Sequence, residues 1–293
     1  GRGRVPPPPH PGTQAMTPKE KILFSEEQET LLITLYCRAV SGEQLLFNDP
    51  KSQEILESIE YDFSRLKVPL KTCLTVCIRA KKLDDYARQF LKAHLQSAEQ
   101  EVPVVLHLGC GLDSRCLRVD NGWVEWYDLD LPAVIELRGK FYEETDRYHM
   151  IAASAADLRW LEQVNAQGRP VMVIAEGLLM YLSEAQVKAL LLALQQAFPG
   201  CQVAFDAFST LTARSVGRHA SLRQTGAAVH WGIDDAGAIE TWAPGIRLEE
   251  EWFFAQSELV ERMDWGYRLA FKLAGAFALV NKAHRILLFS LSQ

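Results

Sequence analysis

The spacing of hydrophobic positions divides the chain into an N-terminal helical part and a longer part in which strands alternate with helices. Over residues 16–98, apolar residues recur three or four positions apart, as on one face of an α-helix. A first helix is expected after Ser25, whose hydroxyl can cap it with Gln28 three residues later. A second begins at Asn48-Asp49-Pro50, and a third follows Val68-Pro69. We expect residues 16–98 to form a helical extension.

From residue 103 onward the pattern changes to short β-rich runs bounded by turn residues. Five such runs are Val104–Leu108, Val124–Leu129, Tyr148–Ala153, Val171–Ala175 and Gln202–Phe205. The clearest helix between them is Ser183–Phe198, and two late runs, Trp252–Ala255 and Ile286–Leu291, are expected to pair antiparallel. Strands that alternate with helices predict an α/β fold over residues 99–293, with a mostly parallel seven-stranded sheet covered on both faces.

The composition fits a folded chain with a large core. Of the 293 residues, 48% are hydrophobic and 23% are charged, which excludes intrinsic disorder for most of the chain. The formal net charge of −6 and the lack of a long basic block argue against nucleic acid as the main partner. No apolar run reaches the ~20 residues of a membrane-spanning helix, so we expect no membrane partner.

Residues 1–15 differ from the rest of the chain. They hold five of the 13 prolines and no acidic residue, so we interpret them as a disordered leader or a cloning remnant. The six cysteines form no Cys-x-x-Cys pair, which favours free thiols in a reducing cytoplasm. Cys73 and Cys77 lie one helical turn apart and could share a metal ion, but no further ligand is near them in sequence. No metal site is predicted.

Residues that can bind a ligand or take part in a reaction follow the ends of four consecutive predicted strands. The first strand ends in Gly109-Cys110-Gly111, where two glycines allow a tight turn and a close approach of the backbone to a ligand. Acidic residues follow the next three strands, namely Asp130, Asp157 and Glu176. Ligands of such sheets bind beyond the carboxyl ends of the strands. The four ends therefore predict a site for a ligand with adenosine hydroxyls and a cationic portion.

Each of these residues has a structural alternative. The glycines can serve the turn alone, and the acids can be helix caps or solvated loop residues. Asp130 lies 21 residues after Gly109, so it can reach ribose hydroxyls or cap the helix that starts at Pro132. Ser114 stands where a dinucleotide fingerprint has its third glycine, which disfavours a nicotinamide oxidoreductase. No lysine follows the glycines, which disfavours a nucleotide phosphate site.

Three stretches carry a resemblance to a known family: residues 106–115 (LHLGCGLDSR), 126–132 (WYDLDLP) and 175–182 (AEGLLMYL). Together they resemble the leucine carboxyl methyltransferase superfamily, in particular its bacterial branch, which includes polyketide O-methyltransferases of the tetracenomycin type. The likeness covers roughly residues 45–290. It implies a class I methyltransferase (Rossmann-like) fold, S-adenosylmethionine as cofactor, and acceptor-binding insertions after residue 206.

Carried over residue by residue, the resemblance implies a cofactor site made of Arg79, Gly109, Gly111, Asp130, Asp157, Leu158 and Glu176. Gly109 would contact the methionine part of the cofactor, and Asp130 would bind the ribose hydroxyls. Asp157 and Leu158 would read the adenine through its amino group and a ring nitrogen. Glu176 would lie near the methionine amino group.

The resemblance also concerns two arginines. Arg79 matches a family arginine that holds the cofactor carboxylate, and guanidinium–carboxylate pairing is bidentate and strong. The alternative for Arg79 is a solvated helix face beside Lys81 and Lys82. Asp113 and Arg115 match the bacterial pattern as well, either as an ion pair that braces the loop or as ligand contacts.

No catalytic residue is identified from the sequence. A carboxylate acceptor needs no general base, whereas a base would help a phenol or an alcohol. His230 follows the last core strand and Tyr181 follows Glu176, so both are candidates for the acceptor side, with a structural role as the alternative for His230. An aromatic wall for a planar acceptor, or the packing of extra helices, would account for Trp231, Trp242, Trp252 and Trp265.

These patterns lead us to expect an S-adenosylmethionine-dependent O-methyltransferase that acts on a hydroxyl or carboxylate of a small acceptor. Two alternatives remain. One is a carboxyl methyltransferase for a protein C-terminus, and the other is a regulatory protein that binds the cofactor without catalysis.

Overall fold

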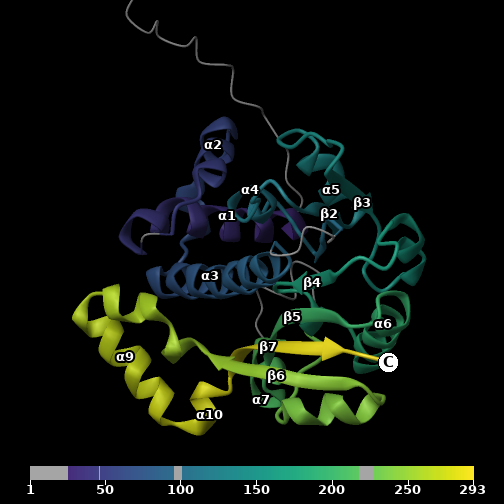
Figure 1. Ribbon diagram of the computed structural model, residues 1–293. Helices are drawn as coiled ribbons and strands as arrows, with labels where there is room; N and C mark the ends of the chain where they lie inside the picture. Colours follow the sequence, from purple (N-terminus) through teal and green to yellow (C-terminus); the bar gives the residue numbers. More distant parts are fainter. Residues whose placement is uncertain (1–25, 46, 96–100, 218–227) are drawn as a thin grey trace, which may run out of the picture.

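The centre of the molecule is a seven-stranded sheet with helices on both faces (Figure 1). The computed structural model describes residues 26–45, 47–95, 101–217 and 228–293. The strand order is β3-β2-β1-β4-β5-β7-β6, in which β1 to β5 run parallel and β7 is antiparallel to both of its neighbours. The strands are β1 (Val104–Leu108), β2 (Glu125–Asp130), β3 (Tyr148–Ala152), β4 (Val171–Ala175), β5 (Cys201–Phe208), β6 (Ile246–Phe253) and β7 (His284–Leu291). The predicted α/β fold is confirmed.

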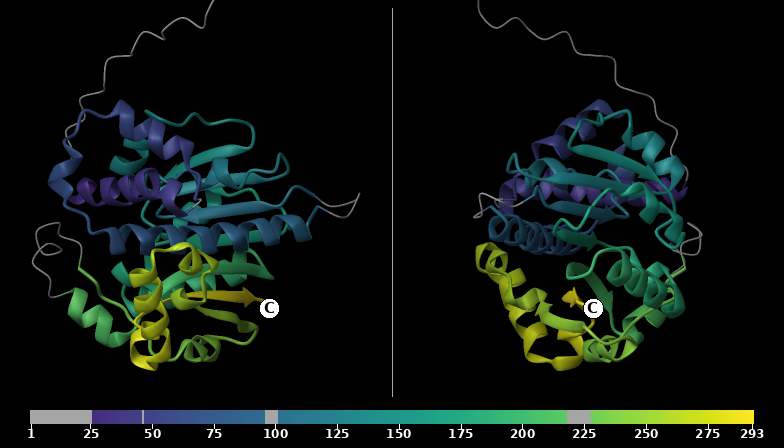
Figure 2. Two further views of the ribbon diagram at one scale, coloured as in Figure 1. Left: turned by 90° about the vertical axis from the view of Figure 1, so that its left-hand side faces the viewer. Right: turned by 45° about the vertical axis from the view of Figure 1, so that its right-hand side comes forward.

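Helices connect the strands and precede them. The α-helices are α1 (Glu26–Leu45), α2 (Pro50–Ser58), α3 (Leu70–Ala93), α4 (Arg115–Arg118), α5 (Pro132–Arg138), α6 (Glu184–Ala197), α7 (Thr210–Val216), α9 (Trp265–Ala276) and α10 (Ala278–Asn281). The short 3-10 helices are η1 (Phe63–Leu66), η2 (Leu158–Gln163), η3 (Leu179–Tyr181), η4 (Ala236–Trp242), η5 (Phe254–Gln256) and η6 (Glu258–Arg262). The long helix α3 packs on the sheet and α1 packs against α3, as Figure 2 shows.

The alternation of side chains along the strands creates two cores. Val105 of β1 faces the side that α1, α2 and α3 cover, where it packs in one cluster with Ile78 and Leu83. Leu106 faces the other side, in a second cluster with Leu190 of α6. Every residue of β1 is buried because both faces of the sheet are covered. This explains why every residue of the strand except His107 is apolar.

Two predicted helix starts are seen at the atomic level. The carboxylate of Asp49 accepts a hydrogen bond from the Ser52 backbone N–H at 3.0 Å, where α2 begins with Pro50. Ser183 and Gln186 form a reciprocal capping box that begins α6. The predicted cap at Ser25 and the predicted leader lie outside the described residues.

Two strands differ from the prediction by three residues or more at one end. The strand expected at Trp252–Ala255 is β6, which begins six residues earlier at Ile246 and ends at Phe253. It is an edge strand with a bulge, and its charged residues Arg247 and Glu249 interrupt the apolar pattern. The strand expected to end at Phe205 runs on to Phe208, since β5 pairs with β7 up to that residue, and the buried Asp206 interrupts its apolar run.

In the four described segments, no helix is long and apolar enough to cross a membrane. All six cysteines are buried, and none forms a disulfide bond. The sulfur of Cys73 lies 2.6 Å from that of Cys37 on α1. The part of the chain that the structure describes contains no group of three metal-ligating side chains suited to hold an ion.

Candidate functional site

The turn after β1 has the backbone conformation that only glycine adopts easily. Gly109 and Gly111 have φ angles of +68° and +52°, in the left-handed region. A Cβ atom on Gly109 would come within 3.2 Å of the Leu178 side chain. The Gly109 N–H donates to the carbonyl of Leu129 at 2.7 Å, which ties the turn to the end of β2. The glycines therefore bring the backbone to the edge of the sheet where β1, β2 and β4 end.

Asp130 at the end of β2 holds this turn in place. Its Oδ2 accepts a hydrogen bond from the Gly111 N–H at 2.8 Å, and its Oδ1 accepts one from the Leu131 N–H at 2.8 Å. The alternative that Asp130 caps α5 is wrong, since the residue at the N-cap is Leu131 and no side chain caps that helix. Burial raises the pKa of Asp130 above its ordinary value. The carboxylate bridges the first and second strand ends.

A cavity of about 280 Å³ opens beside the glycine turn. Six of the predicted site residues line it: Arg79, Gly109, Gly111, Asp130, Glu176 and Tyr181. They come from α3, the turn after β1, the end of β2 and the loop after β4, so residues up to 102 positions apart in sequence meet at one place. Residues from three of the four predicted strand ends thus meet at one cavity on the carboxyl-end edge of the sheet.

Arg79 connects two strand-end carboxylates. Its Nε lies 3.0 Å from Oε1 of Glu176, and its Nη1 lies 3.1 Å from Oδ2 of Asp206. Asp206 also accepts a hydrogen bond from the Gly177 backbone N–H at 2.6 Å. Only 13% of the Arg79 side chain is exposed, so the alternative of a solvated helix face does not hold. Its role toward the cofactor stays a prediction.

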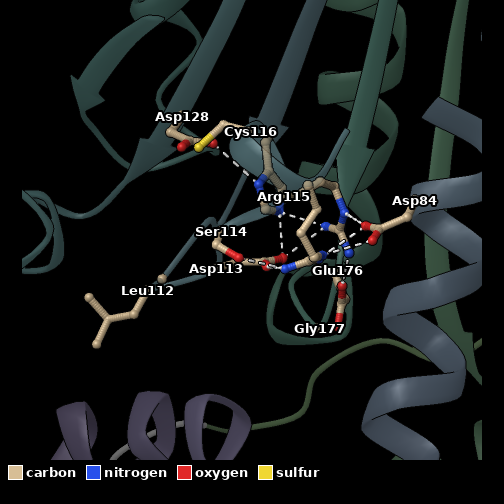
Figure 3. Close-up of polar contacts among 12 residues, drawn as sticks. Asp84, Leu112, Asp113, Ser114, Arg115, Cys116, Asp128, Glu176 and Gly177 are labelled. Atoms are coloured by element: carbon tan, nitrogen blue, oxygen red, sulfur yellow. Dashed lines mark hydrogen bonds and ion pairs between the residues drawn. The ribbon is translucent and has the colours of Figure 1, made fainter. Parts of the chain in front are cut away.

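Arg115 lies at the centre of a group of buried charges (Figure 3). Its Nε donates to Oδ1 of Asp84 at 2.7 Å, its Nη1 lies 3.2 Å from Oδ2 of Asp113, and its Nη2 donates to Glu176. The ion pair between Asp113 and Arg115 is therefore present. Because none of the Arg115 side chain is exposed, its contacts lie in a medium of low dielectric constant, where a lost partner is costly.

Two more arginines extend this group. Nη1 of Arg118 lies 2.9 Å from Asp49 and 2.7 Å from Asp113. Nη2 of Arg38 lies 3.3 Å from Glu176 and 3.5 Å from Asp113. We call the connected set the buried charge cluster, and its members are Arg38, Arg79, Arg115, Arg118, Asp49, Asp84, Asp113, Glu176 and Asp206.

The arginines favour the ionised form of four acids of the cluster, whose pKa values are lowered: Asp84, Asp113, Glu176 and Asp206. Burial alone raises the pKa of Asp84, but Arg118 and Arg115 outweigh it and leave this pKa below its ordinary value. Burial likewise opposes ionisation of Glu176, and the guanidinium groups of Arg115 and Arg79 hold its pKa far below the usual range. The cluster therefore stabilises the folded state as long as these acids are ionised.

We expect the free energy of unfolding to fall as the pH decreases from about 6 to about 3. A carboxylate whose pKa is lower in the folded than in the unfolded chain stabilises the fold above its unfolded pKa of ~4, and this contribution disappears as the pH falls through the folded pKa. Asp130, whose pKa is raised, changes the free energy of unfolding in the opposite direction. It is one group, whereas several acids have a lowered pKa. Urea unfolding over this pH range measures the effect, and equal free energies at both ends would contradict it.

Three predicted site residues lie away from the cavity lining. Asp157 begins η2, where its carboxylate accepts a hydrogen bond from the Arg159 backbone N–H at 3.3 Å and pairs with the Arg159 guanidinium. Leu158 follows it in the same short helix. Their contact with adenine stays a prediction. His230 is exposed, and its backbone N–H donates to the carbonyl of Met180 at 2.8 Å.

The tryptophans of the last third of the chain mostly pack in the cores. Trp231 is buried, and its ring lies 6.2 Å from Phe205 and 6.4 Å from Trp242. Trp252 is buried in the core on the other face of the sheet. Trp265, in contrast, is 75% exposed at the start of α9.

The sequence interpretation missed Asp206 and Arg38. Asp206 follows Phe205 directly, so the rule that located Asp130 and Glu176 would have found it had it been applied to the fifth strand. Arg38 carries no such signal, because it lies in α1 among apolar residues and meets Glu176 only through the packing of α1 on α3.

The chain is similar in sequence to known proteins over most of its length. The sequence profile described as leucine carboxyl methyltransferase matches residues 33–195. The tetracenomycin polyketide synthesis O-methyltransferase TcmP of Streptomyces glaucescens is 41% identical over 252 residues, which cover 83% of this chain and 91% of that protein. The S-adenosyl-L-methionine-dependent methyltransferase dpfgK of Gibberella zeae is 32% identical over 259 residues, which cover 80% and 85%.

Among solved structures, a DUF574 family protein from Streptomyces avermitilis aligns over 92% of this chain and 100% of that chain, with a TM-score of 0.54. At 13% identity this likeness concerns the fold alone. The sequence relatives confirm the prediction of a methyltransferase that uses S-adenosylmethionine. The chain belongs to the leucine carboxyl methyltransferase family.

Proposed function

We propose that this protein transfers the methyl group of S-adenosylmethionine to an oxygen atom of a small, planar, polyketide-like acceptor. The observation that carries the proposal is the strand-end cavity, in which Asp130, Glu176 and Arg79 meet the glycine turn. The similarity to TcmP, which extends over most of both chains, supports a small acceptor of this kind. The net charge of −6 supports a small molecule over nucleic acid.

The residues that line the cavity fit the chemical groups of this cofactor. Asp130 offers carboxylate oxygens to a ribose diol, and Glu176 offers negative charge to the methionine ammonium group. Arg38 lines the same cavity, and its buried Nε–H has no acceptor among the described residues. We assign this donor, together with Arg79, to the methionine carboxylate. Gly109 lines the cavity without a side chain, which leaves room for the methionine chain beside its backbone.

We assign the adenine to the loop after β3, which carries Asp157 and Leu158. When bound, the cofactor supplies a methyl group on a positively charged sulfur, which an oxygen nucleophile attacks in line. The work of the protein is to orient the two reactants and to exclude water. Leu178 and Tyr181, which line the cavity next to the glycine turn, serve the second task. We place the reaction in the cytoplasm, where the six thiols stay reduced.

Transfer of a labelled methyl group tests this proposal. The protein is incubated with S-adenosylmethionine labelled in its methyl group and with a panel of planar phenols and aromatic carboxylic acids. We expect label in at least one acceptor as an O-methyl product. Asp130→Ala should lose this transfer, whereas Asp120→Ala, which removes a carboxylate before the opposite end of β2, should keep it. Cofactor binding without transfer to any member of a broad panel would contradict the proposal.

A further inference from the structure

A second cavity, of about 260 Å³, lies on the face of the sheet that α3 covers, and no residue that the structure describes lines both it and the strand-end cavity. Its walls come from the start of α2, from α4, from the amino ends of β2 and β3, and from the loop between α5 and β3. Leu117, which lines it, is 55% exposed, so the cavity opens to solvent. Ligand pockets usually measure ~300–1,000 Å³, so this cavity suits a compact ligand of one or two rings.

Four aromatic side chains line this cavity, which we call the aromatic cavity: Trp126, Phe141, Tyr142 and Tyr148. The rings of Tyr142 and Tyr148 lie 6.4 Å apart between centroids and are tilted by 46°. The polar atoms of Trp126 and Tyr148 are already used within the protein, because both donate to the carboxylate of Asp128, at 2.8 and 2.7 Å. These side chains therefore offer a ligand their apolar ring surface, on which a flat aromatic molecule packs in an offset or edge-on arrangement.

Lys51 adds a positive charge to the wall of the aromatic cavity. Its side chain is only 20% exposed, and its Nζ lies 5.5 Å from the centroid of the Tyr142 ring. The carboxylate partner of Lys51 is Glu54 at 2.7 Å, but 65% of the Glu54 side chain is exposed. Because water weakens such a pair, the carboxylate of a ligand can take the place of Glu54 at little cost.

The other charges of the lining do not change this preference for an anion. Asp120 and Arg147 are exposed and pair with each other at 3.1 Å, and Glu143 is exposed to solvent that screens its charge. A cationic ligand is disfavoured, because the guanidinium carbon of Arg138 already lies 3.8 Å from the Tyr142 ring centroid. The lining thus fits an aromatic ring that carries one negative charge.

The walls of the aromatic cavity also hold the glycine turn of the strand-end cavity. The Tyr142 hydroxyl donates to the carbonyl of Leu112 at 3.1 Å. Arg138 donates from Nε to the Tyr148 hydroxyl at 2.9 Å and from Nη1 to the carbonyl of Gly111 at 3.0 Å. Gly111 and Leu112 both line the strand-end cavity. The two cavities therefore share a set of hydrogen bonds, although they share no lining residue.

We propose that the aromatic cavity binds a small aromatic carboxylate, which pairs with Lys51, and that this ligand strengthens cofactor binding. The second half rests on the cofactor position in the proposed function. A ligand packed against Tyr142 and Tyr148 restricts the side chains that hold the carbonyls of the glycine turn. Part of the order that cofactor binding requires is then present beforehand, so each ligand favours the binding of the other.

Calorimetry with 2-naphthoate and its uncharged analogue 2-naphthalenemethanol tests the site. In the presence of saturating S-adenosylhomocysteine, we expect the acid to bind about tenfold more tightly than the alcohol, because a hydrogen bond to a charged group is stronger than one to a neutral group. Lys51→Met should remove this preference and leave the affinity for the alcohol unchanged. The matched control is Lys188→Met, since Lys188 is an exposed lysine of α6 on the other face of the sheet, and it should keep the preference.

The variant Tyr148→Phe separates binding from coupling. In the wild type, saturating 2-naphthoate should lower the Kd of S-adenosylhomocysteine about fivefold or more, and S-adenosylhomocysteine should lower the Kd of 2-naphthoate by the same factor. Phenylalanine keeps the ring that contacts the ligand but lacks the hydroxyl that Arg138 contacts. The variant should therefore still bind 2-naphthoate, which also shows that it folds, and the coupling factor should fall toward one.

The remaining outcomes distinguish this inference from the proposed function. Wild-type protein that binds S-adenosylhomocysteine but no 2-naphthoate would overturn the inference and leave the proposed function intact. A preference for the acid that survives Lys51→Met would place the acid in the acceptor site and overturn the inference as well. Wild-type coupling in Tyr148→Phe, or no coupling in the wild type, would overturn its second half. Wild-type protein that binds 2-naphthoate through Lys51 but no S-adenosylhomocysteine would overturn the proposed function and support the aromatic cavity as a site.

Discussion

The variant Arg115→Met should have a free energy of unfolding about 3–5 kcal/mol lower than the wild type. Its guanidinium is completely buried and contacts the carboxylates of Asp84, Asp113 and Glu176. Methionine fills part of the space but supplies no charge and no hydrogen-bond donor. The acids would then share the remaining arginines, and part of their negative charge would be buried without compensation. Equilibrium unfolding in urea, followed by circular dichroism, measures the loss.

A surface ion pair provides the control for this prediction. Nη1 of Arg147 lies 3.1 Å from Oδ1 of Asp120, and 46% of the Arg147 side chain is exposed. Because water screens such a pair, Arg147→Met should change the free energy of unfolding by no more than about 1 kcal/mol. If both variants lost the same small amount, the buried charge cluster would not be the source of stability that its geometry indicates.

The variant Asp130→Ala should weaken the binding of S-adenosylhomocysteine about 10- to 100-fold. A hydrogen bond to a charged group contributes about 1.5–3 kcal/mol, and 1.4 kcal/mol corresponds to a factor of ten in affinity. The substitution also removes the acceptor that the Gly111 and Leu131 N–H groups share, so the glycine turn loses its support. Isothermal titration calorimetry at constant pH measures the change.

Two further variants separate these contributions to binding. Asp130→Asn keeps an oxygen acceptor for the turn but lacks the charge, so its affinity should lie between that of Asp130→Ala and the wild type. Asp120→Ala should bind as the wild type does, because this exposed acid precedes the other end of β2. Unchanged affinity in Asp130→Ala would remove Asp130 from the cofactor site. If Asp157→Ala alone lost affinity for S-adenosylhomocysteine, the cofactor site would have to be assigned nearer to η2.

The core strands and the strand-end acids could be predicted because their signals are local. β1 and β4 are buried on both faces, so each is a short apolar run that ends where the chain turns. Asp130 and Glu176 follow such runs directly. β6 could not be delimited in this way, because an edge strand needs to be apolar on one face only and Arg247 lies in it.

The partners of the buried charges could not be predicted from the sequence. Arg115 contacts Asp84 because α4 and α3 pack on the same face of the sheet. The sequence around either residue gives no sign of this contact. His284 is a single histidine before an apolar run. It contacts Asp206 because β5 and β7 pair in an antiparallel register, which the sequence does not show. The sequence indicated His230 for the acceptor side; that residue is exposed in the structure, and its role stays a prediction.

The buried charge cluster also constrains the order in which the chain folds. Arg38 and Glu176 are 138 residues apart, and Arg79 and Asp206 are 127 residues apart. Closing loops of this length costs chain entropy before any contact compensates for it, so such contacts form late. During synthesis, Arg79 has no Asp206 to pair with until β5 has been made. Cofactor bound to the folded chain then adds stability that intermediates lacking these contacts do not share.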